Sequence, residues 1–215
     1  MARTAKVVVA VVAASVAFLV VGNLAIVVAS KWAKSTTPVT RIESIDGIDN
    51  LEAVDAKLWR GAAPSEDGYR NLAAAGTTTI VDLRAEDGLE ADNALVESLG
   101  MRLIRIPVRD GQTPSSSQIA AFLEATQQSE GTVFVHCGAG VGRTGAMVGA
   151  YSVASGELNA GGAVRRNLAV GPPSLEQLAF VAGLGDDGIE RPNVAVRAVS
   201  RVLDSPRRIA HRLGL

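Results

Sequence analysis

The stretch VFVHCGAGVGRTGAM, residues 133–147, constrains the fold more than any other part of this chain. It opens with a β-branched run typical of a buried strand, passes through a glycine-rich loop and returns to helix-forming residues. A turn of this kind points successive backbone N–H groups inward at a helix N-terminus, where they favour a bound anion. Cys137, the only cysteine in the chain, lies at the base of the loop. The stretch therefore predicts an anion-binding loop with a thiol beneath it.

The glycines of this loop allow two interpretations. Gly140, Gly142 and Gly145 match the G-x-G-x-x-G pattern of dinucleotide folds, which also need a following strand and an acidic residue about 20 residues on. The segment after the next helix holds no β-branched run, and no lysine stands where a Walker A loop would require one. Cys137 and Arg143 instead form a C-x5-R pattern. That pattern favours a thiolate that attacks phosphate.

Each polar residue around the loop fits phosphate chemistry. The loop N–H groups would stabilise a thiolate at Cys137, and the planar guanidinium of Arg143 can hold two phosphate oxygens. Thr144 can hydrogen-bond the thiolate. His136 is interpreted as a buried residue that hydrogen-bonds backbone near the loop, with a direct chemical role as the alternative. The residues predicted to bind phosphate are Gly138, Ala139, Gly140, Val141, Gly142 and Arg143.

Three segments resemble one known family. HCGAGVGRTG (136–145) matches the H-C-x-x-G-x-x-R-[ST]-G signature of the cysteine-dependent protein tyrosine and dual-specificity phosphatases. PVRDGQTPS (107–115) resembles the general-acid loop of the dual-specificity members, especially the mitotic-exit phosphatases. LWRGAAPS (58–65) and TTTIVDLR (77–84) look like the opening of bacterial members. The resemblance covers about residues 55–183.

The resemblance implies phosphoryl transfer without a metal or other cofactor. Cys137 would attack phosphorus to give a phosphocysteine, and Asp110 would protonate the leaving oxygen and later activate water. Arg143 and the loop would bind the phosphate oxygens throughout. Gln177 resembles the glutamine that orients the hydrolytic water, although a glutamine on a helix is usually solvated. Asp82 is the alternative acid, but it lies in a strand where a neighbouring arginine can pair with it.

The loop also bears on the substrate. None of the residues between Cys137 and Arg143 is basic, whereas a polyanionic phosphoinositide would favour lysines there. We therefore expect phosphoprotein substrates, with phosphotyrosine first and phosphoserine or phosphothreonine next. A phospholipid or phosphoinositide headgroup is the alternative. A second alternative is a non-catalytic, membrane-tethered phospho-binding scaffold. Such a module would lack the cysteine, the arginine or the acid, and all three are present.

Strand and helix patterns alternate along the polar part of the chain, which predicts an α/β fold with a largely parallel sheet flanked by helices. Strands are expected over 57–62, 77–84, 101–108 and 132–137. Helices are expected from Ser65 to near Gly76 and over 90–100, 118–129, 143–155, 158–169 and 174–183. Ligands of such sheets bind beyond the carboxyl ends of the strands. Cys137 falls at such an end.

Residues 7–29 are apolar and carry no charge. As a helix they are long enough to cross a hydrocarbon core of ~30 Å, and Trp32 follows at a position suited to the membrane interface. We expect an uncleaved, single-pass membrane anchor. A signal peptide whose cleavage leaves a secreted protein is the alternative, although signal cores are usually shorter. Basic residues flank the run almost equally, so the orientation stays open.

The chain divides into four predicted parts: a membrane anchor (1–34), a linker leading into the domain (35–54), a phosphatase domain (55–185) and a basic amphipathic tail (186–215). The tail is interpreted as a helix packed on the domain with a solvated basic face, and the alternative lays it on anionic lipid. The net charge of −1 argues against nucleic-acid partners. Two histidines and one cysteine argue against a zinc site.

Overall fold

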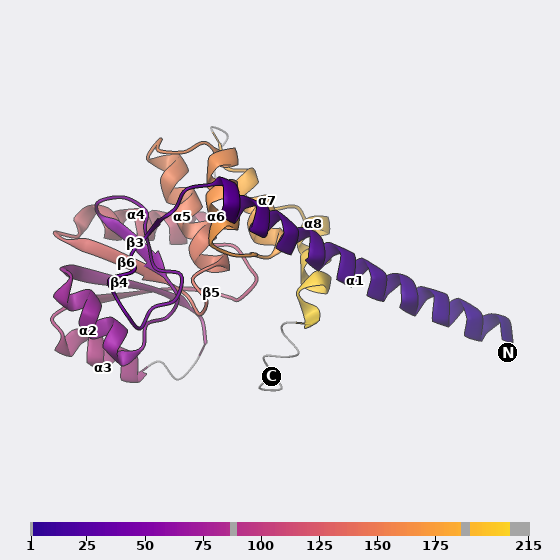
Figure 1. The fold of residues 1–215 in the computed structure, drawn as a ribbon, viewed down its shortest axis with the longest axis horizontal. Coiled ribbons are helices and arrows are strands. Elements are labelled where there is room, and N and C mark those ends of the chain that lie inside the picture. Colours follow the sequence, from indigo (N-terminus) through magenta and orange to yellow (C-terminus); the bar gives the residue numbers. More distant parts are fainter. Residues whose placement is uncertain (1, 87–89, 186–189, 207–215) are drawn as a thin grey trace.

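The computed structural model describes residues 2–86, 90–185 and 190–206 (Figure 1). A six-stranded sheet lies at its centre, in the order β1-β2-β3-β6-β4-β5. The strands are β1 (Thr40–Arg41), β2 (Glu52–Ala53), β3 (Leu58–Gly61), β4 (Thr77–Arg84), β5 (Arg102–Val108) and β6 (Thr132–His136). Strands β3, β6, β4 and β5 run parallel, whereas β1 and β2 form an antiparallel edge beside β3. The predicted α/β fold with a largely parallel sheet is confirmed.

Helices cover both faces of this sheet (Figure 1). The helices of the domain are α2 (Glu66–Ala74), α3 (Glu90–Ser98), α4 (Ser116–Gln128), α5 (Gly142–Ala154), α6 (Ala160–Val170) and α7 (Leu175–Ala182). Side chains of β6 alternate between two core clusters, as the two-residue period of a strand requires. Val133 and Val135 pack with residues of α4, α5 and α7, whereas Phe134 packs with Tyr69 and Leu72 of α2. The central strand is therefore buried on both faces.

Serine caps fix where several of these helices begin. The Ser65 hydroxyl accepts a hydrogen bond from a backbone N–H in the first turn of α2, so the helix begins next to the expected start. Ser115 and Ser174 each form a capping box, with Gln118 and Gln177 respectively. The two capping boxes stand at the starts of α4 and α7, on either side of the loop that holds the predicted general acid.

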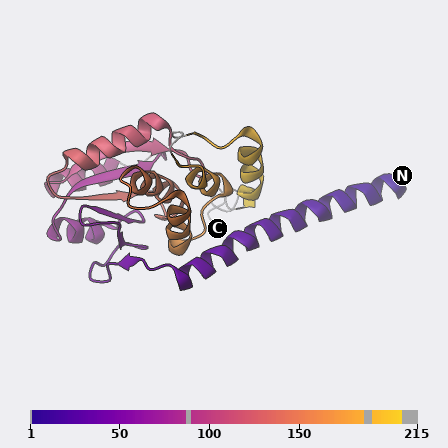
Figure 2. The ribbon, with the colours of Figure 1, turned by 90° about the horizontal axis from the view of Figure 1, so that it is seen from above.

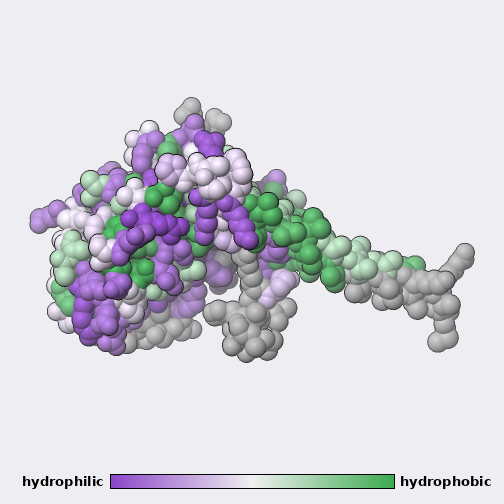
Figure 3. All heavy atoms as spheres, viewed as in Figure 1, coloured by the Kyte–Doolittle hydropathy of each residue, from purple (hydrophilic) through white to green (hydrophobic). Residues whose placement is uncertain are grey.

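Helix α1 (Ala2–Thr36) is the longest element, and its N-terminal half projects from the domain (Figures 1 and 2). Its C-terminal half packs on α6 and on α8 (Val194–Leu203), and the Ser30 hydroxyl donates to the Leu168 carbonyl at 2.8 Å. The span Ala13–Thr36 is long and apolar enough to cross a membrane, and only 6% of its most apolar window is buried. Figure 3 shows this apolar surface along the helix. A membrane anchor and a signal sequence share these properties.

The segment 35–54, which is expected to be a linker leading into the domain, contains the end of α1 and two short strands. Helix α1 continues to Thr36 and β1 begins at Thr40, so only residues 37–39 lie between them. Strands β1 and β2 are two residues long, which is too short to show a period of two in the sequence. The segment predicted to lead into the domain therefore already forms the edge of its sheet.

Candidate active site

The loop after β6 leads from the centre of the sheet into α5. Cys137 is the first residue of this loop, and it is 3% exposed and packed against the hydrophobic core. Val141 stands at the N-cap of α5 and gives the helix no side-chain cap. The first N–H groups of α5 are therefore left for another acceptor, and the positive end of the helix dipole favours an anion there.

The carbonyl groups of the loop are held from behind by the region around β3. Three hydrogen bonds do this: Ala63 N–H to the Gly138 carbonyl at 2.9 Å, Asn50 Nδ2 to the Ala139 carbonyl at 3.0 Å, and Arg60 Nη2 to the Gly140 carbonyl at 2.7 Å. In a planar trans peptide the C=O and the following N–H point in opposite directions. The N–H groups of residues 139–141 are therefore turned away from these donors. The loop is shaped as an anion nest by its surroundings.

Glycine is required at two positions of the loop for steric reasons. Gly140 has a φ of +70°, and a Cβ there would collide with the backbone of Gly61. A Cβ on Gly142 would collide with the side-chain amide of Gln177. Gly140 and Gly142, two of the three glycines that match a dinucleotide pattern, thus allow close packing of the loop against β3 and α7.

Arg60 holds the loop and was not predicted as a site residue. It is 1% exposed, and its Nε lies 4.0 Å from Glu52 Oε2. Glu52 Oε1 also accepts from Arg166 Nε at 2.6 Å. Burial lowers the pKa of Arg60, and the nearby carboxylate of Glu52 offsets part of that effect. The only sign of this role in the sequence is an arginine inside a predicted strand. The carbonyl that Arg60 binds, that of Gly140, is 80 positions away in the chain.

Arg143 connects the loop to the predicted general acid. Its side chain is 4% exposed, and its Nε lies 3.4 Å from Asp110 Oδ1. A Cβ built on Gly138 would lie 3.6 Å from Arg143 Nη2, so the guanidinium lies beside the residue that follows Cys137. The fold thus brings Cys137, Arg143 and Asp110 to one place, at the carboxyl ends of β5 and β6.

Glu86, after β4, orients the guanidinium of Arg143. Arg143 Nη1 donates to Glu86 Oε2 at 2.9 Å and to the Val108 carbonyl at 3.3 Å. Burial lowers the pKa of Arg143, but the hydrogen bond to Glu86 and the electrostatic effect of the neighbouring acidic side chains outweigh burial and raise it. Partial burial raises the pKa of Glu86, but Arg143 outweighs that effect and lowers it. Both groups are therefore charged at neutral pH, and Glu86 is a second contact that the sequence did not indicate.

The loop that carries Asp110 is attached to the start of α7. The Ser174 hydroxyl donates to the Gly111 carbonyl at 3.0 Å, and Gln177 Nε2 donates to the Gln112 carbonyl at 3.1 Å. Gln177 is 2% exposed, so it is not a solvated residue. The Asp110 side chain is 72% exposed at the edge of the site. Gln177 thus lies between the anion loop and the acid loop.

His136 and Thr144 are both fully buried beside the loop. His136 Nδ1 lies 3.2 Å from the Cys137 carbonyl oxygen, and its ring stacks on Phe134. Burial lowers the pKa of His136 to about 4, although the carboxylate of Asp82 opposes this shift. The ring is therefore neutral at pH 7, and its Nδ1 contacts the backbone. Thr144 Oγ1 is buried without a hydrogen-bond partner among the described residues.

Asp82, the alternative acid, forms an ion pair with Arg84. It is 1% exposed, and Arg84 Nη2 lies 2.8 Å from Asp82 Oδ2. Burial raises the pKa of Asp82, but the hydrogen bonds from Arg84 outweigh burial and lower it. A buried carboxylate that is held ionised by an arginine is a poor proton donor.

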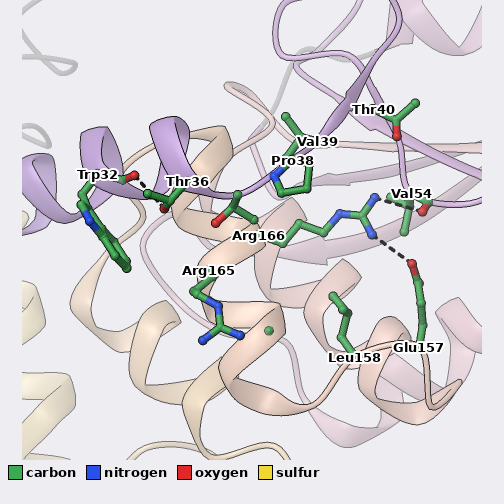
Figure 4. A pocket seen from close by; sticks show the side chains of 12 residues that line it. Trp32, Thr36, Pro38, Val39, Thr40, Val54, Glu157, Leu158, Arg165 and Arg166 are labelled. Atoms are coloured by element: carbon green, nitrogen blue, oxygen red, sulfur yellow. Dashed lines mark hydrogen bonds and ion pairs between the residues drawn. The ribbon is translucent and has the colours of Figure 1, made fainter.

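A cavity of about 670 Å³ lies away from this site, where the end of α1 meets α6 (Figure 4). Trp32 and Arg165 line it, together with Arg166, which donates to the Val54 carbonyl at 2.9 Å and pairs with Glu157 at 3.1 Å. None of the predicted site residues lines this cavity. This cavity is therefore separate from the candidate active site.

Two curated proteins are similar to parts of this chain. The probable NAD kinase 2, chloroplastic, of Oryza sativa subsp. japonica is 30% identical over 155 residues, which are 65% of this chain and 15% of that protein. The tyrosine-protein phosphatase CDC14 homolog of Schizosaccharomyces pombe is 38% identical over 64 residues, which are 29% of this chain and 12% of that protein. The chain thus spans a small part of each curated relative.

The fold also matches a solved structure. P. aeruginosa TpbA in complex with pTyr is 22% identical, with a TM-score of 0.57 over 72% of this chain and 94% of that chain. A family model described as a DSP-PTPase phosphatase fused to NAD+ kinase matches residues 27–183. That range includes the end of α1, the edge strands and the whole site. The chain belongs to this PTP-NADK family, and its domain is a cysteine-dependent phosphatase domain of the dual-specificity and tyrosine phosphatase type.

Proposed function

We propose that the protein hydrolyses phosphomonoesters through a phosphocysteine intermediate. The Cys137 thiolate attacks phosphorus, a P–S bond forms, and the P–O bond to the leaving group breaks. Water then attacks phosphorus, the P–S bond breaks, and inorganic phosphate leaves while the thiolate is restored. The observation that carries the proposal is the position of Arg143, which lies beside Gly138 and 3.4 Å from Asp110.

Arg143 stabilises charge in this reaction, and Asp110 transfers protons. Arg143 and the N–H groups of the loop bind the equatorial oxygens, whose charge they stabilise in the transition state. A phosphate dianion at Arg143 takes the place that the Asp110 carboxylate holds in the free enzyme. Asp110 then protonates the leaving oxygen and in the second step takes a proton from water. Thr144 Oγ1, buried and unpartnered among the described residues, donates to the thiolate, and Gln177 orients the water.

Replacing Asp110 with alanine tests this assignment. We expect kcat to fall about 10²–10³-fold for a phosphotyrosine peptide, because the leaving phenolate needs a proton. The loss should be smaller for para-nitrophenyl phosphate, whose leaving group is stable without one. Asp67→Ala, which removes a carboxylate that is 86% exposed on α2, is the matched control. Equal losses for both substrates would show that another group is the acid.

Phosphotyrosine on proteins is the substrate that we propose first. The loop residues 138–142 carry no basic side chain, so the site offers little to the additional phosphates of a phosphoinositide. The related fold of TpbA was solved with pTyr, which supports the same choice. The full chain should therefore have a higher kcat/KM for phosphotyrosine peptides than for phosphoserine peptides or short-chain phosphoinositides. A preference for a phosphoinositide over every peptide would overturn this choice.

We propose further that α1 anchors the phosphatase domain in a membrane, with the domain boundaries set out above. The exposed apolar face of α1, which includes Val16, Phe18 and Val20, supports this proposal, because such a face is costly in water. Asp110 and Cys137 then act beside the membrane on the side where the domain lies. Proteins that are phosphorylated near that surface are the natural substrates of such an arrangement.

A further inference from the structure

Helix α8 is packed on one side by the domain and by α1. Its Ser200 and Leu203 are buried, and Ser200 Oγ accepts from the Glu176 N–H at 3.0 Å. Asn23 Nδ2 of α1 donates to the Leu203 carbonyl at 3.1 Å. A Cβ on Gly22 would lie 2.7 Å from Leu203 Cδ2, so the glycine makes room for this leucine. The helix thus meets α1 at the level of Gly22 and Asn23.

The opposite side of α8 is apolar and exposed. Val194, Val199 and Val202 are 71%, 38% and 52% exposed. Val199 and Val202 are three residues apart and are therefore neighbours on the helix surface, and Val194 lies further round the helix, about one and a half turns earlier. A surface helix of a domain in water would place polar residues there. Two arginines flank this strip: Arg201 is exposed, and Arg197 is half-buried.

The length of α1 locates the membrane relative to α8. Residues 2–21 lie before the level at which the two helices meet, and Figures 1 and 2 show that part of α1 projecting from the domain. Residues 7–21, the uncharged part of this segment, span about 22 Å as a helix. Arg3 and Lys6 precede them at positions suited to the far headgroups, so the segment is long enough to cross a hydrocarbon core of about 30 Å.

The sequence predicts a membrane span over 7–29. In the structure one side of the helix beyond Asn23 packs on α6, where the Ser30 hydroxyl donates to the Leu168 carbonyl, so this part is not fully available to lipid. A bilayer entered by residues 2–21 ends beside α8.

We propose that the exposed valines of α8 (Val194, Val199 and Val202) lie on the surface of the bilayer that α1 enters. The inference rests on α1 being a membrane anchor. The valines bury apolar surface at the headgroup boundary, and the nearby arginines favour anionic lipid. The contact also fixes the active site beside the membrane, because a Cβ on Gly111 would lie 3.4 Å from Asp204 Oδ2 at the end of α8.

The test uses the full chain with Cys137→Ser, which removes the native thiol, and one new cysteine that carries an environment-sensitive fluorophore. The labelled positions are Val199→Cys on α8, Val16→Cys on the projecting half of α1, and Ala121→Cys on α4 as the exposed control. The proteins are reconstituted in vesicles of phosphatidylcholine with phosphatidylglycerol. We expect nitroxide lipids to quench the probes on Val199 and Val16 and not the control. Iodide in the water should quench the Val199 probe several-fold less than the control.

Each contrary result has a distinct meaning. A lipid-exposed Val16 probe with a water-exposed Val199 probe overturns the α8 surface and leaves the anchor in place. Two water-exposed probes overturn the anchor and, with it, the surface. A Val199 probe that is shielded from iodide but not quenched by nitroxide lipids means that a second copy or another protein covers α8, which also overturns the proposal. Protection of Val199 should decrease when phosphatidylglycerol is left out, because the arginines lose their partners.

Discussion

Replacing Cys137 with serine is expected to reduce kcat for para-nitrophenyl phosphate on the order of 10⁴-fold or more, as loss of a nucleophile does in other covalent enzymes. A serine hydroxyl at the base of the loop stays protonated, because the loop has no general base to take its proton. The substitution changes one buried atom that is packed against the core. The measurement is steady-state turnover of the full chain in detergent.

The same variant separates catalysis from binding. The loop N–H groups and Arg143 are unchanged, so inorganic phosphate should bind Cys137→Ser about as well as it binds the native protein, as measured by calorimetry. The midpoint of thermal unfolding should stay within a few degrees. Turnover within tenfold of the native rate would falsify the phosphocysteine mechanism. Loss of both turnover and phosphate binding in a folded protein would show that the thiol instead shapes the loop.

Arg143→Ala is expected to lower kcat/KM on the order of 10³–10⁵-fold, in the range known for arginines that neutralise a transferring phosphoryl group. The guanidinium is held by Glu86 at 2.9 Å and by the Val108 carbonyl at 3.3 Å, so its planar fork is oriented before substrate binds. Arg143→Lys keeps the charge but loses the fork, and should still cost about 10²–10³-fold.

The matched control for these variants is Arg165→Lys, on the exposed side of α6, where the side chain lines the separate cavity. Its kcat/KM should stay within about twofold of native, since surface substitutions away from a site are usually small in effect. Phosphate affinity should fall in Arg143→Ala and stay native in Arg165→Lys. If Arg143→Lys were as active as the native enzyme, the bidentate grip would have no part in the reaction.

The local sequence predicted the strands and helices of the domain closely. Strands β4 to β6 and helices α2 to α7 begin and end near the expected residues. The signals that set these ends are local: hydrophobic periodicity, serine caps and terminating glycines all lie within a few residues of the element they define. The edge strands β1 and β2 were missed, since two residues show no period. The glycine loop, Cys137 and Arg143 could be placed in sequence because strand, loop and helix are contiguous.

Contacts between distant segments were decided by the tertiary structure. Arg60 reaches the Gly140 carbonyl across 80 positions, and Glu86 reaches Arg143 across 57. No local pattern encodes such pairs, because they depend on which strands become neighbours in the sheet. The level at which α1 leaves the domain is likewise set by α6 and α8, not by the apolar run itself. The sequence by itself determined the strand–loop–helix unit and its thiol, through short-range backbone chemistry. Tertiary packing decided which distant residues hold that loop in shape and which helices lie beside the active site.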